Sequence, residues 1–303
     1  MITPEILSII MFLTTLGLLL FGFPVAFTLA GSALIFGFLG DALEIFNFRM
    51  IGFFPQRIFG TMINEPLVAV PLFIFMGIML EKTKIAAGLL QSIGELFGST
   101  KGGLGIGVVI VGMLLAASTG IVGATVVTMG MLSLPSMMKA GYDQKIATGT
   151  ICAAGTLGQI IPPSIVLIII ADQLASAADV ANTMRQTDYK IVTGEFNMPG
   201  ELRVGSTSAG DMFLGALLPG LVLVGLYMIY VLVYARLNPK AAPPVPFKGN
   251  FDSKFWIRVV MVIIPPLALI FAVLGSILMG IATVNQAGSI GAIGATMMAG
   301  YRL

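Results

Sequence analysis

Long apolar segments recur along the whole chain and leave few folds open to it. They lie at about residues 6–38, 66–80, 103–138, 146–171, 212–235 and 255–281. A membrane-spanning helix needs about 20 mostly apolar residues, whereas a spanning β-strand needs only about 10 that alternate with polar ones. Only 10% of the residues are charged, against about 25% in an average soluble domain. The sequence therefore predicts an all-α polytopic membrane protein.

Several classes of function are disfavoured by residues that the chain lacks. It contains no histidine, which is the commonest general base and metal ligand. No Gly-x-x-x-x-Gly-Lys-Ser/Thr loop is present, so an ATP-driven motor is not encoded. Cys152 is the only cysteine, which excludes a disulfide framework or a thiolate metal site. We expect no enzyme, no transition-metal site, no cofactor and no nucleic-acid partner.

The first part of the chain, residues 1–101, is predicted to form scaffold and arm helices. Gly22-Phe23-Pro24 interrupts the first apolar run, which is therefore either one kinked helix or two short ones. Residues 47–65 and 81–101 mix apolar and charged side chains and are interpreted as amphipathic arms at the membrane surface. Between them lies a short span. No cleavable signal peptide is evident, because Pro4 and Glu5 precede the first run and no basic segment does.

The next part, residues 102–174, contains two interrupted apolar segments. Residues 103–138 have a small, polar centre at 118–125, and each flank is too short for a comfortable span, so we predict a re-entrant helical hairpin. In residues 155–164 the pair Pro162-Pro163 lies where a spanning helix should run. Proline removes a backbone donor, and in hydrocarbon each freed group must find another partner. We therefore predict a broken helix here.

Charge sets the expected orientation. Residues 236–258 carry five basic residues against one acidic residue, and residues 172–211 carry three basic against six acidic. Because basic loops stay in the cytoplasm, residues 175–210 are predicted to be an extracytoplasmic polar loop, and the hairpin enters from the cytoplasm. Residues 211–303 would hold a crossing helix, a cytoplasmic linker and the start of a second repeat.

The two interruptions form a candidate ion site. Broken helices expose free carbonyls that bind hard cations such as sodium, and half-helix N-termini that attract anions. Neutral side-chain oxygens are also available, and the prolines keep residues 158–161 unwound. These oxygens come from Ser118, Thr119, Thr125, Thr156 and Ser164. Small residues in membrane helices also serve close packing, and the sequence leaves both interpretations open.

Other polar or proline-containing positions are assigned structural roles. Pro265-Pro266 lacks the Gly-Thr-x-Gly before it and the serine after it, so it is predicted to be a kink only. Gln159, Asn285 and Gln286 are predicted to make helix–helix hydrogen bonds rather than to bind an ion.

At these residues the chain resembles a known family. The relevant motifs occur in order: Gly22-Phe23-Pro24-Val25-Ala26-Phe27, Pro71-Leu72-Phe73-Ile74-Phe75-Met76-Gly77, Ser118-Thr119-Gly120 with Ala124-Thr125, Gly155-Thr156-Leu157-Gly158-Gln159-Ile160-Ile161-Pro162-Pro163-Ser164 and Leu217-Leu218-Pro219-Gly220. Together they are similar to the large membrane subunit (DctM type) of TRAP transporters, the tripartite ATP-independent periplasmic transporters. The resemblance covers nearly the whole chain apart from residues 175–208.

The resemblance implies a sodium-coupled, elevator-type importer of organic carboxylates in the bacterial inner membrane, built from inverted repeats that each hold a hairpin and a broken helix. Its implied partners are the lipid bilayer, a small membrane subunit and a periplasmic binding protein that delivers the substrate. By this likeness the sodium ligands are Ser118, Thr119, Gly120, Gly158, Ile161 and Pro163. The substrate ligands are Gly123, Thr125, Thr156 and Ser164.

The sequence departs from the family pattern in three places. The tip 118–125 has Ser-Thr-Gly-Ile-Val-Gly-Ala-Thr where the family more often has Ser-Gly-Ser-Ser before Ala-Thr, and residues 283–287 have Thr-Val-Asn-Gln-Ala in place of Thr-Pro-Thr-Glu-Ala. The chain ends before a second hairpin and broken helix, from which we expect a C-terminally truncated protein with a complete first repeat and a partial second one. The alternative function is accordingly a non-transporting membrane scaffold of such a complex.

Overall fold

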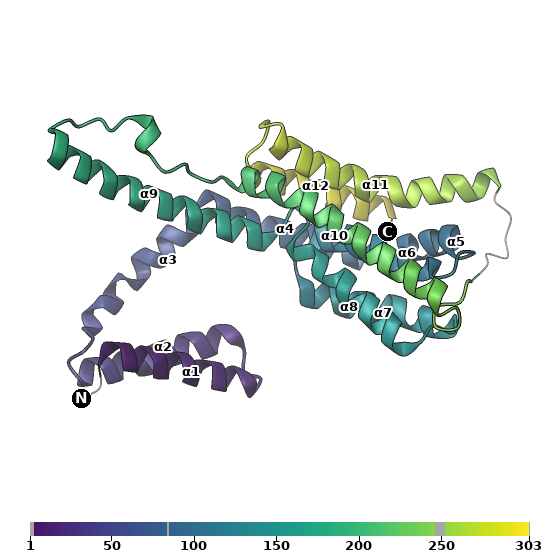
Figure 1. Ribbon diagram of the computed structural model, residues 1–303, viewed down its shortest axis with the longest axis horizontal. Coiled ribbons are helices and arrows are strands. Elements are labelled where there is room, and N and C mark those ends of the chain that lie inside the picture. The colour runs from purple at the N-terminus through teal and green to yellow at the C-terminus, as the bar shows by residue number, and fades with distance from the viewer. Residues whose placement is uncertain (1–2, 84, 246–251, 303) are drawn as a thin grey trace. The chain divides into compact units, whose positions relative to one another are not determined.

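The computed structural model describes residues 3–83, 85–245 and 252–302, and these residues form helices joined by short connections, without a strand among them (Figure 1). Four helices are long and apolar enough to cross a membrane: Val25–Ala42, Ile165–Thr193, Ala209–Leu237 and Phe255–Leu278. A fifth span results if residues 48–62 and 65–82 count as one bent segment. The predicted all-α membrane architecture is confirmed at this level.

The chain divides into two compact units, Met1–Asn64 and Glu65–Leu303. The first holds α1 (Pro4–Leu20), α2 (Val25–Ala42), the 3₁₀ helix η1 (Phe48–Phe53) and α3 (Phe54–Met62). Of the two possibilities for the first apolar run, the structure has two short helices, because the chain turns at Gly22, whose φ of 81° suits glycine. The buried hydroxyls of Thr15 and Ser32 hydrogen-bond at 2.9 Å and join α1 to α2.

The second unit holds the other helices. Its first half has α4 (Glu65–Lys82), α5 (Ile85–Phe97), α6 (Gly103–Thr119), α7 (Val122–Lys139) and α8 (Gln144–Thr156). Its second half has η2 (Leu157–Gln159), α9 (Ile165–Thr193), η3 (Gly200–Leu202), α10 (Ala209–Leu237), α11 (Ser253–Leu278) and α12 (Val284–Arg302). The prolines Pro265 and Pro266 lie inside the continuous helix α11, so this second proline pair does not break its helix.

The core of the second unit forms around the parallel pair α4 and α12. One face of α12 consists of small residues and is buried: Ala287 and Ala295 have no exposed area, and a Cβ on Gly291 would lie 2.6 Å from the sulfur of Met76. Small residues on one helix allow the other backbone to approach closely. The pair thereby supports the neighbouring hairpin α6–α7, because α4 also packs against α6.

The polar segment 172–211 differs from its predicted form. The first half is not a loop, because α9 continues to Thr193 before Gly194, in the left-handed conformation, ends it. No glycine or proline, the two residues that most disfavour a helix, lies in residues 165–193. The polar residues of this segment are compatible with a helix. The chain then returns along the projecting end of α9 (Figure 1). We call residues 175–208 the outer arm.

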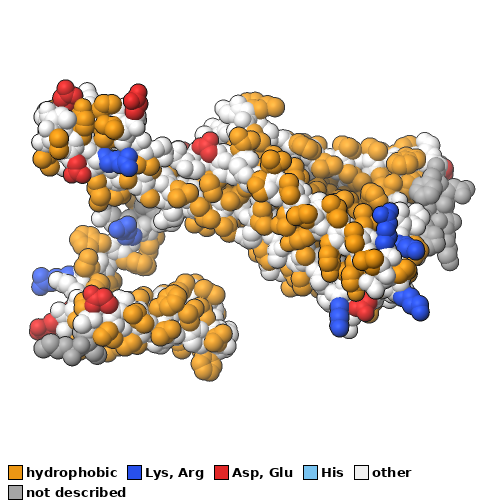
Figure 2. Space-filling view, viewed as in Figure 1, with side chains coloured by type: hydrophobic (Ala, Val, Ile, Leu, Met, Phe, Trp, Pro, Cys, Tyr) orange, Lys and Arg blue, Asp and Glu red, His pale blue; other side chains and the backbone are white. Residues whose placement is uncertain are grey.

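Charged side chains of the second unit gather at its extremities (Figure 2). Basic side chains lie near the ends of α6 and α7, and acidic ones lie on the outer arm, with hydrophobic side chains covering the helices between them. This is the distribution expected of a protein whose two ends face water on opposite sides of a bilayer. The predicted division into regions 1–101, 102–174, 175–210 and 211–303 remains a prediction.

Candidate functional site

The hairpin turns within two residues. α6 ends at Thr119 and α7 begins at Val122, so only Gly120 and Ile121 lie outside the helices. Gly120 has a φ of 61°, which other residues rarely adopt. The predicted interruption in residues 118–125 is thus present, and it is narrower than the polar stretch in the sequence.

The second interruption is a broken helix, as predicted. After α8, one 3₁₀ turn (η2) is followed by a turn and a bend over residues 160–163, and α9 begins at Ile165. Gly158 therefore lies in the 3₁₀ turn, whereas the sequence predicts that residues 158–161 are unwound throughout. Because Pro162 and Pro163 have no N–H, the carbonyls of Gly158 and Gln159, four residues earlier, lose their helical donors. The Gln159 carbonyl accepts instead from the hydroxyl of Ser164 at 2.8 Å. Among the described residues none donates a hydrogen bond to the Gly158 carbonyl, which leaves this oxygen available to a ligand.

Ser164 also begins the second half of the broken helix. Its side chain is fully buried, and its oxygen accepts from the Leu167 amide at 3.4 Å as the N-cap of α9. An N-cap serine satisfies one of the orphan amides of a helix start. The first-turn amides of Ile165 and Val166 have no partner within their own helix. They give the break a partial positive charge that favours anions.

The two interruptions meet. The side-chain amide of Gln159 donates to the carbonyl of Gly120 at 3.0 Å, across 39 positions of sequence. A Cβ on Gly120 would lie 3.1 Å from Cγ1 of Ile165, so the hairpin tip also lies close to the start of α9. The prediction that Gln159 makes a hydrogen bond between helical elements is confirmed. Gln286, by contrast, caps its own helix α12, since its side chain accepts from the Thr283 amide at 2.9 Å.

The predicted ligand residues differ in burial. Gly120, Gly158, Ile161, Pro163, Thr125 and Ser164 are buried, whereas Gly123 and Thr156 are exposed. The hydroxyls of Thr125 and Thr156 donate to carbonyls of their own helices, Ile121 at 2.9 Å and Ala153 at 2.8 Å. The hydroxyl oxygen of Thr156 keeps lone pairs that can still accept or coordinate. The backbone of Ser118 and Thr119 ends α6, and their side chains lie outside the part of the chain that the structure describes.

Three glycines near the breaks serve packing. A Cβ on Gly155 would lie 2.3 Å from Cγ2 of Val126, and one on Gly112 would lie 2.5 Å from Cβ of Ala154. A Cβ on Gly220 of α10 would come within 3.1 Å of Ile161. These glycines let α6, α7 and α10 close around the broken helix.

One contact near the site could not be predicted from the sequence. The carboxylate of Glu81, in the last turn of α4, accepts from the hydroxyl of Thr128 on α7 at 2.8 Å. Hydrogen bonds to charged groups are stronger than neutral ones. This bond joins the hairpin to α4, although Glu81 in the sequence looks like an ordinary surface acid at a helix end.

Comparison with known proteins gives consistent matches. The family described as "Tripartite ATP-independent periplasmic transporter, DctM component" matches residues 12–185 and 197–302. The C4-dicarboxylate TRAP transporter large permease protein of Vibrio cholerae is 28% identical over 293 residues, covering 96% of this chain and 55% of that protein. The ectoine TRAP transporter large permease protein of Halomonas elongata is 28% identical over 286 residues, covering 93% and 56%.

A third relative, the sialic acid TRAP transporter large permease protein of Vibrio cholerae, is 26% identical over 239 residues, covering 78% of this chain and 47% of that protein. The chain thus spans about half the length of the curated relatives it matches. These relatives are permease subunits rather than enzymes.

Proposed function

The chain belongs to the DctM family of tripartite ATP-independent periplasmic transporters, and from this premise we propose that it acts as the large permease subunit of a sodium-coupled importer of organic carboxylates. Its partners would be a small membrane subunit and a periplasmic binding protein, in the bacterial inner membrane. The single observation that carries the proposal is the contact between the two interruptions, where Gln159 bonds to Gly120 beside the freed carbonyl of Gly158.

The chemistry of the break supports a sodium ion. Hard cations take oxygen ligands, and broken membrane helices supply them as backbone carbonyls. Gly158 lies in the 3₁₀ turn η2, and Ile161 and Pro163 lie in the bend after it; all three are buried. Gly120 lies at the tip, which Gln159 contacts. Ser118 and Thr119, at the end of α6, would complete the ion site.

The start of α9 supports an anionic substrate. The amides of Ile165 and Val166 and the helix dipole favour negative charge at the break. Gly123, Thr125, Thr156 and Ser164 surround the two interruptions and would bind the substrate with neutral groups. A carboxylate is therefore the substrate class that this site favours. Sliding of the hairpin and broken helix as one body would carry ion and substrate together.

The sodium site is tested by Gly158→Val in the transporter with its partner subunits. The change puts a branched side chain into a buried turn and displaces the carbonyl, so we expect the sodium concentration for half-maximal uptake of a labelled carboxylate to rise at least about tenfold, equivalent to 1.4 kcal/mol of binding. Gly149→Val is the matched control, since a Cβ there meets nothing within 4 Å. An unchanged sodium requirement in Gly158→Val would remove the assigned site.

The alternative, a membrane scaffold without transport, makes a different prediction. Cells that lack their own uptake system and produce this chain with its partners would take up no carboxylate, with or without sodium. Uptake that requires sodium and continues after ATP depletion would exclude the scaffold function.

The outer arm is the element that we propose contacts the periplasmic binding protein. Its return segment is fixed to α9: Asn182 accepts from the Val204 amide at 2.7 Å and donates to the Val204 carbonyl at 3.0 Å. The Arg185 guanidinium donates to the Leu202 carbonyl at 3.0 Å. Residues 186–196, which include the end of α9, lie outside the family match.

The opposite side of α9 in the arm is apolar and exposed, with Met184 63% and Ile191 76% exposed. A water-facing apolar stripe of this kind marks an interaction surface. In Met184→Asp/Ile191→Asp we expect a higher binding-protein concentration for half-maximal uptake and an unchanged maximal rate. Thr183→Asp, on the flank of the same helix, is the control. Equal behaviour of the two variants would exclude this surface.

A further inference from the structure

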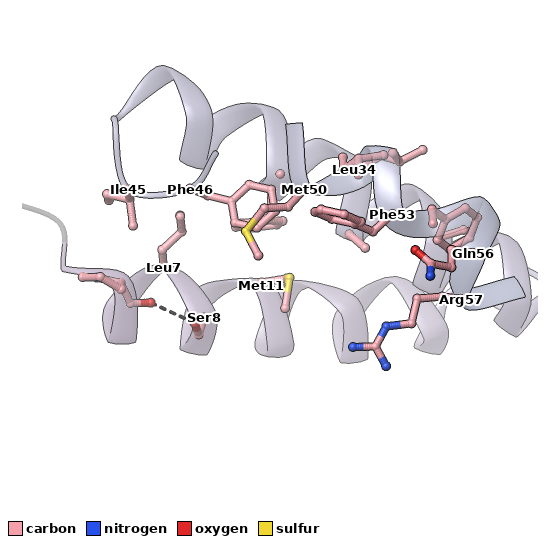
Figure 3. Close-up of a pocket in the computed structure, with 17 residues that line it drawn as sticks. Leu7, Ser8, Met11, Leu34, Ile45, Phe46, Met50, Phe53, Gln56 and Arg57 are labelled. Atoms are coloured by element: carbon pink, nitrogen blue, oxygen red, sulfur yellow. Dashed lines mark hydrogen bonds between the residues drawn. The ribbon is translucent and has the colours of Figure 1, made fainter. Parts of the chain in front are cut away.

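The first unit contains a large apolar groove that the transport site does not use. It has a volume of about 1020 Å³ and lies between α1 on one side and η1 and α3 on the other, with α2 as its floor. Figure 3 shows the hydrophobic side chains that enter it from these elements. Its walls include Leu7, Met11, Leu34, Phe46, Met50 and Phe53.

The walls of the groove are held by specific contacts, so the groove is preformed. Where the chain reverses after α2, the carboxylate of Asp41 accepts from the Phe48 amide at 2.9 Å. The rings of Phe38 and Phe48 stack with centroids 4.2 Å apart. The chain passes so close to α2 here that a Cβ on Gly40 would lie 2.9 Å from Phe46. These contacts fix η1 beside α2 and keep the groove open.

One end of the groove is polar. Gln56 and Arg57 of α3 lie there, while the labelled side chains along the middle are Met11, Met50 and Phe53 (Figure 3). Arg57 is exposed and, among the described residues, pairs with no carboxylate. The groove therefore combines a long apolar surface with one unpaired cation at its end.

This arrangement complements an anionic phospholipid. An acyl chain fills an apolar groove between helices, and a guanidinium forms paired hydrogen bonds with a phosphate. Basic sites at helix grooves of membrane proteins bind the headgroups of anionic lipids. We infer that this groove binds one phospholipid, with its acyl chain along α1 and α2 and its negatively charged headgroup at Arg57.

The test uses the full chain, purified in detergent, delipidated and titrated with phosphatidylglycerol or phosphatidylcholine, with bound lipid counted by native mass spectrometry. We expect one tightly retained phosphatidylglycerol per chain and weaker retention of phosphatidylcholine. Ala33→Phe adds a ring to a residue that lines the groove, and we expect it to lower phosphatidylglycerol retention at least about tenfold, equivalent to 1.4 kcal/mol of binding. Ile35→Phe, at a 58% exposed position that does not line the groove, is the matched control.

The headgroup is tested separately. Arg57→Gln should lower phosphatidylglycerol affinity about fivefold, as loss of about 1 kcal/mol from one basic residue implies, and leave phosphatidylcholine binding unchanged. Arg49→Gln, in η1 and outside the groove, should change neither.

Circular dichroism and size-exclusion profiles establish that each variant is folded. Equal lipid retention in Ala33→Phe and Ile35→Phe would overturn the inference. So would loss of the lipid when the small membrane subunit is added, because the groove would then hold that partner.

Discussion

The hydrogen bond between Gln159 and Gly120 is the most direct way to test whether the two interruptions act as one site. Gln159→Leu replaces the amide with an apolar side chain of similar size and removes the only described donor to the Gly120 carbonyl. Gly120 is buried, so water can replace the lost donor only in part. The contact between the Gln159 carbonyl and Ser164 uses the backbone and is retained.

The size of the effect follows from burial. Leaving a buried carbonyl without its partner costs about 1–3 kcal/mol. Because the Gln159 side chain is only half-buried, some water can reach the bond, and we expect the lower part of that range, about 1–2 kcal/mol. This corresponds to roughly a 5- to 30-fold increase in the ratio of molecules in which tip and break are separated to those in which they are joined.

Hydrogen exchange of the purified chain measures this population directly. In Gln159→Leu the amides around residues 120–122 and 164–167 should exchange about 5- to 30-fold faster, while amides of the pair α4 and α12 are unchanged. Sodium affinity in the assembled transporter should fall by a similar factor. Gln144→Leu, at the exposed start of α8, is the control for loss of a glutamine.

The outcome that would refute the reasoning is specific. If exchange at the tip and at the start of α9 were unchanged in Gln159→Leu, the bond would not hold the two interruptions together. If exchange rose and sodium affinity stayed the same, the interruptions would be joined by this bond but would not share an ion.

Four further substitutions test other parts of the structure. Ser164→Ala removes a buried cap and should cost about 1–2 kcal/mol of stability in thermal unfolding; an unchanged melting temperature would contradict its capping role. Gly155→Ala forces a methyl against Val126 and should destabilise the chain by about 1–3 kcal/mol, whereas Gly149→Ala, where a Cβ meets nothing within 4 Å, should stabilise helix α8 by up to about 1 kcal/mol. Burial raises the pKa of the Tyr142 hydroxyl, so this group ionises first in the unfolded chain. The free energy of unfolding should therefore be constant below the ordinary tyrosine pKa and fall as the pH rises through and above it. Tyr142→Phe should weaken that alkaline loss, measured as melting temperature against pH; an identical alkaline slope would exclude Tyr142 as its source.

The features that could be predicted from sequence are those set by local chemistry. Proline removes a backbone donor, so the break at Pro162-Pro163 could be predicted. The hairpin could be predicted from the small, polar centre of its apolar segment. The length of α9 could not be predicted from the sequence, because a polar stretch without glycine or proline is equally compatible with a loop and with a helix outside the membrane. Gly194 is a typical residue for the end of a helix. Because residues 172–211 are polar, the segment before Gly194 is interpreted from sequence as a loop, and the glycine is not recognised as a helix end.

Contacts between distant segments had no comparable signal. The bond from Gln159 to Gly120, the bond from Glu81 to Thr128 and the groove around Arg57 each join segments that the sequence describes separately. Gln159 could be assigned to a hydrogen bond between helices, since an amide in an apolar segment needs a partner, but its partner depended on how the hairpin folds back. The division after Asn64 likewise depends on contacts, and no change in composition marks it.

The sequence left two interpretations equal, close packing and ligand binding, and the structure tests the packing interpretation residue by residue. Gly155 is required by packing, because a side chain there would collide with Val126, and Gly220 makes a close approach in which a Cβ would lie 3.1 Å from Ile161. Gly158 differs, because its carbonyl has lost its helical donor to Pro162 and no described residue replaces it. The packing glycines bring the hairpin against the broken helix, and the prolines leave the carbonyl of Gly158 without a described hydrogen-bond donor, next to Gln159, which bonds to the tip. Since a backbone oxygen cannot be removed by substitution, the proposed ion site must be tested through the residues that position it, and Gln159→Leu removes a contact to the tip without altering either backbone.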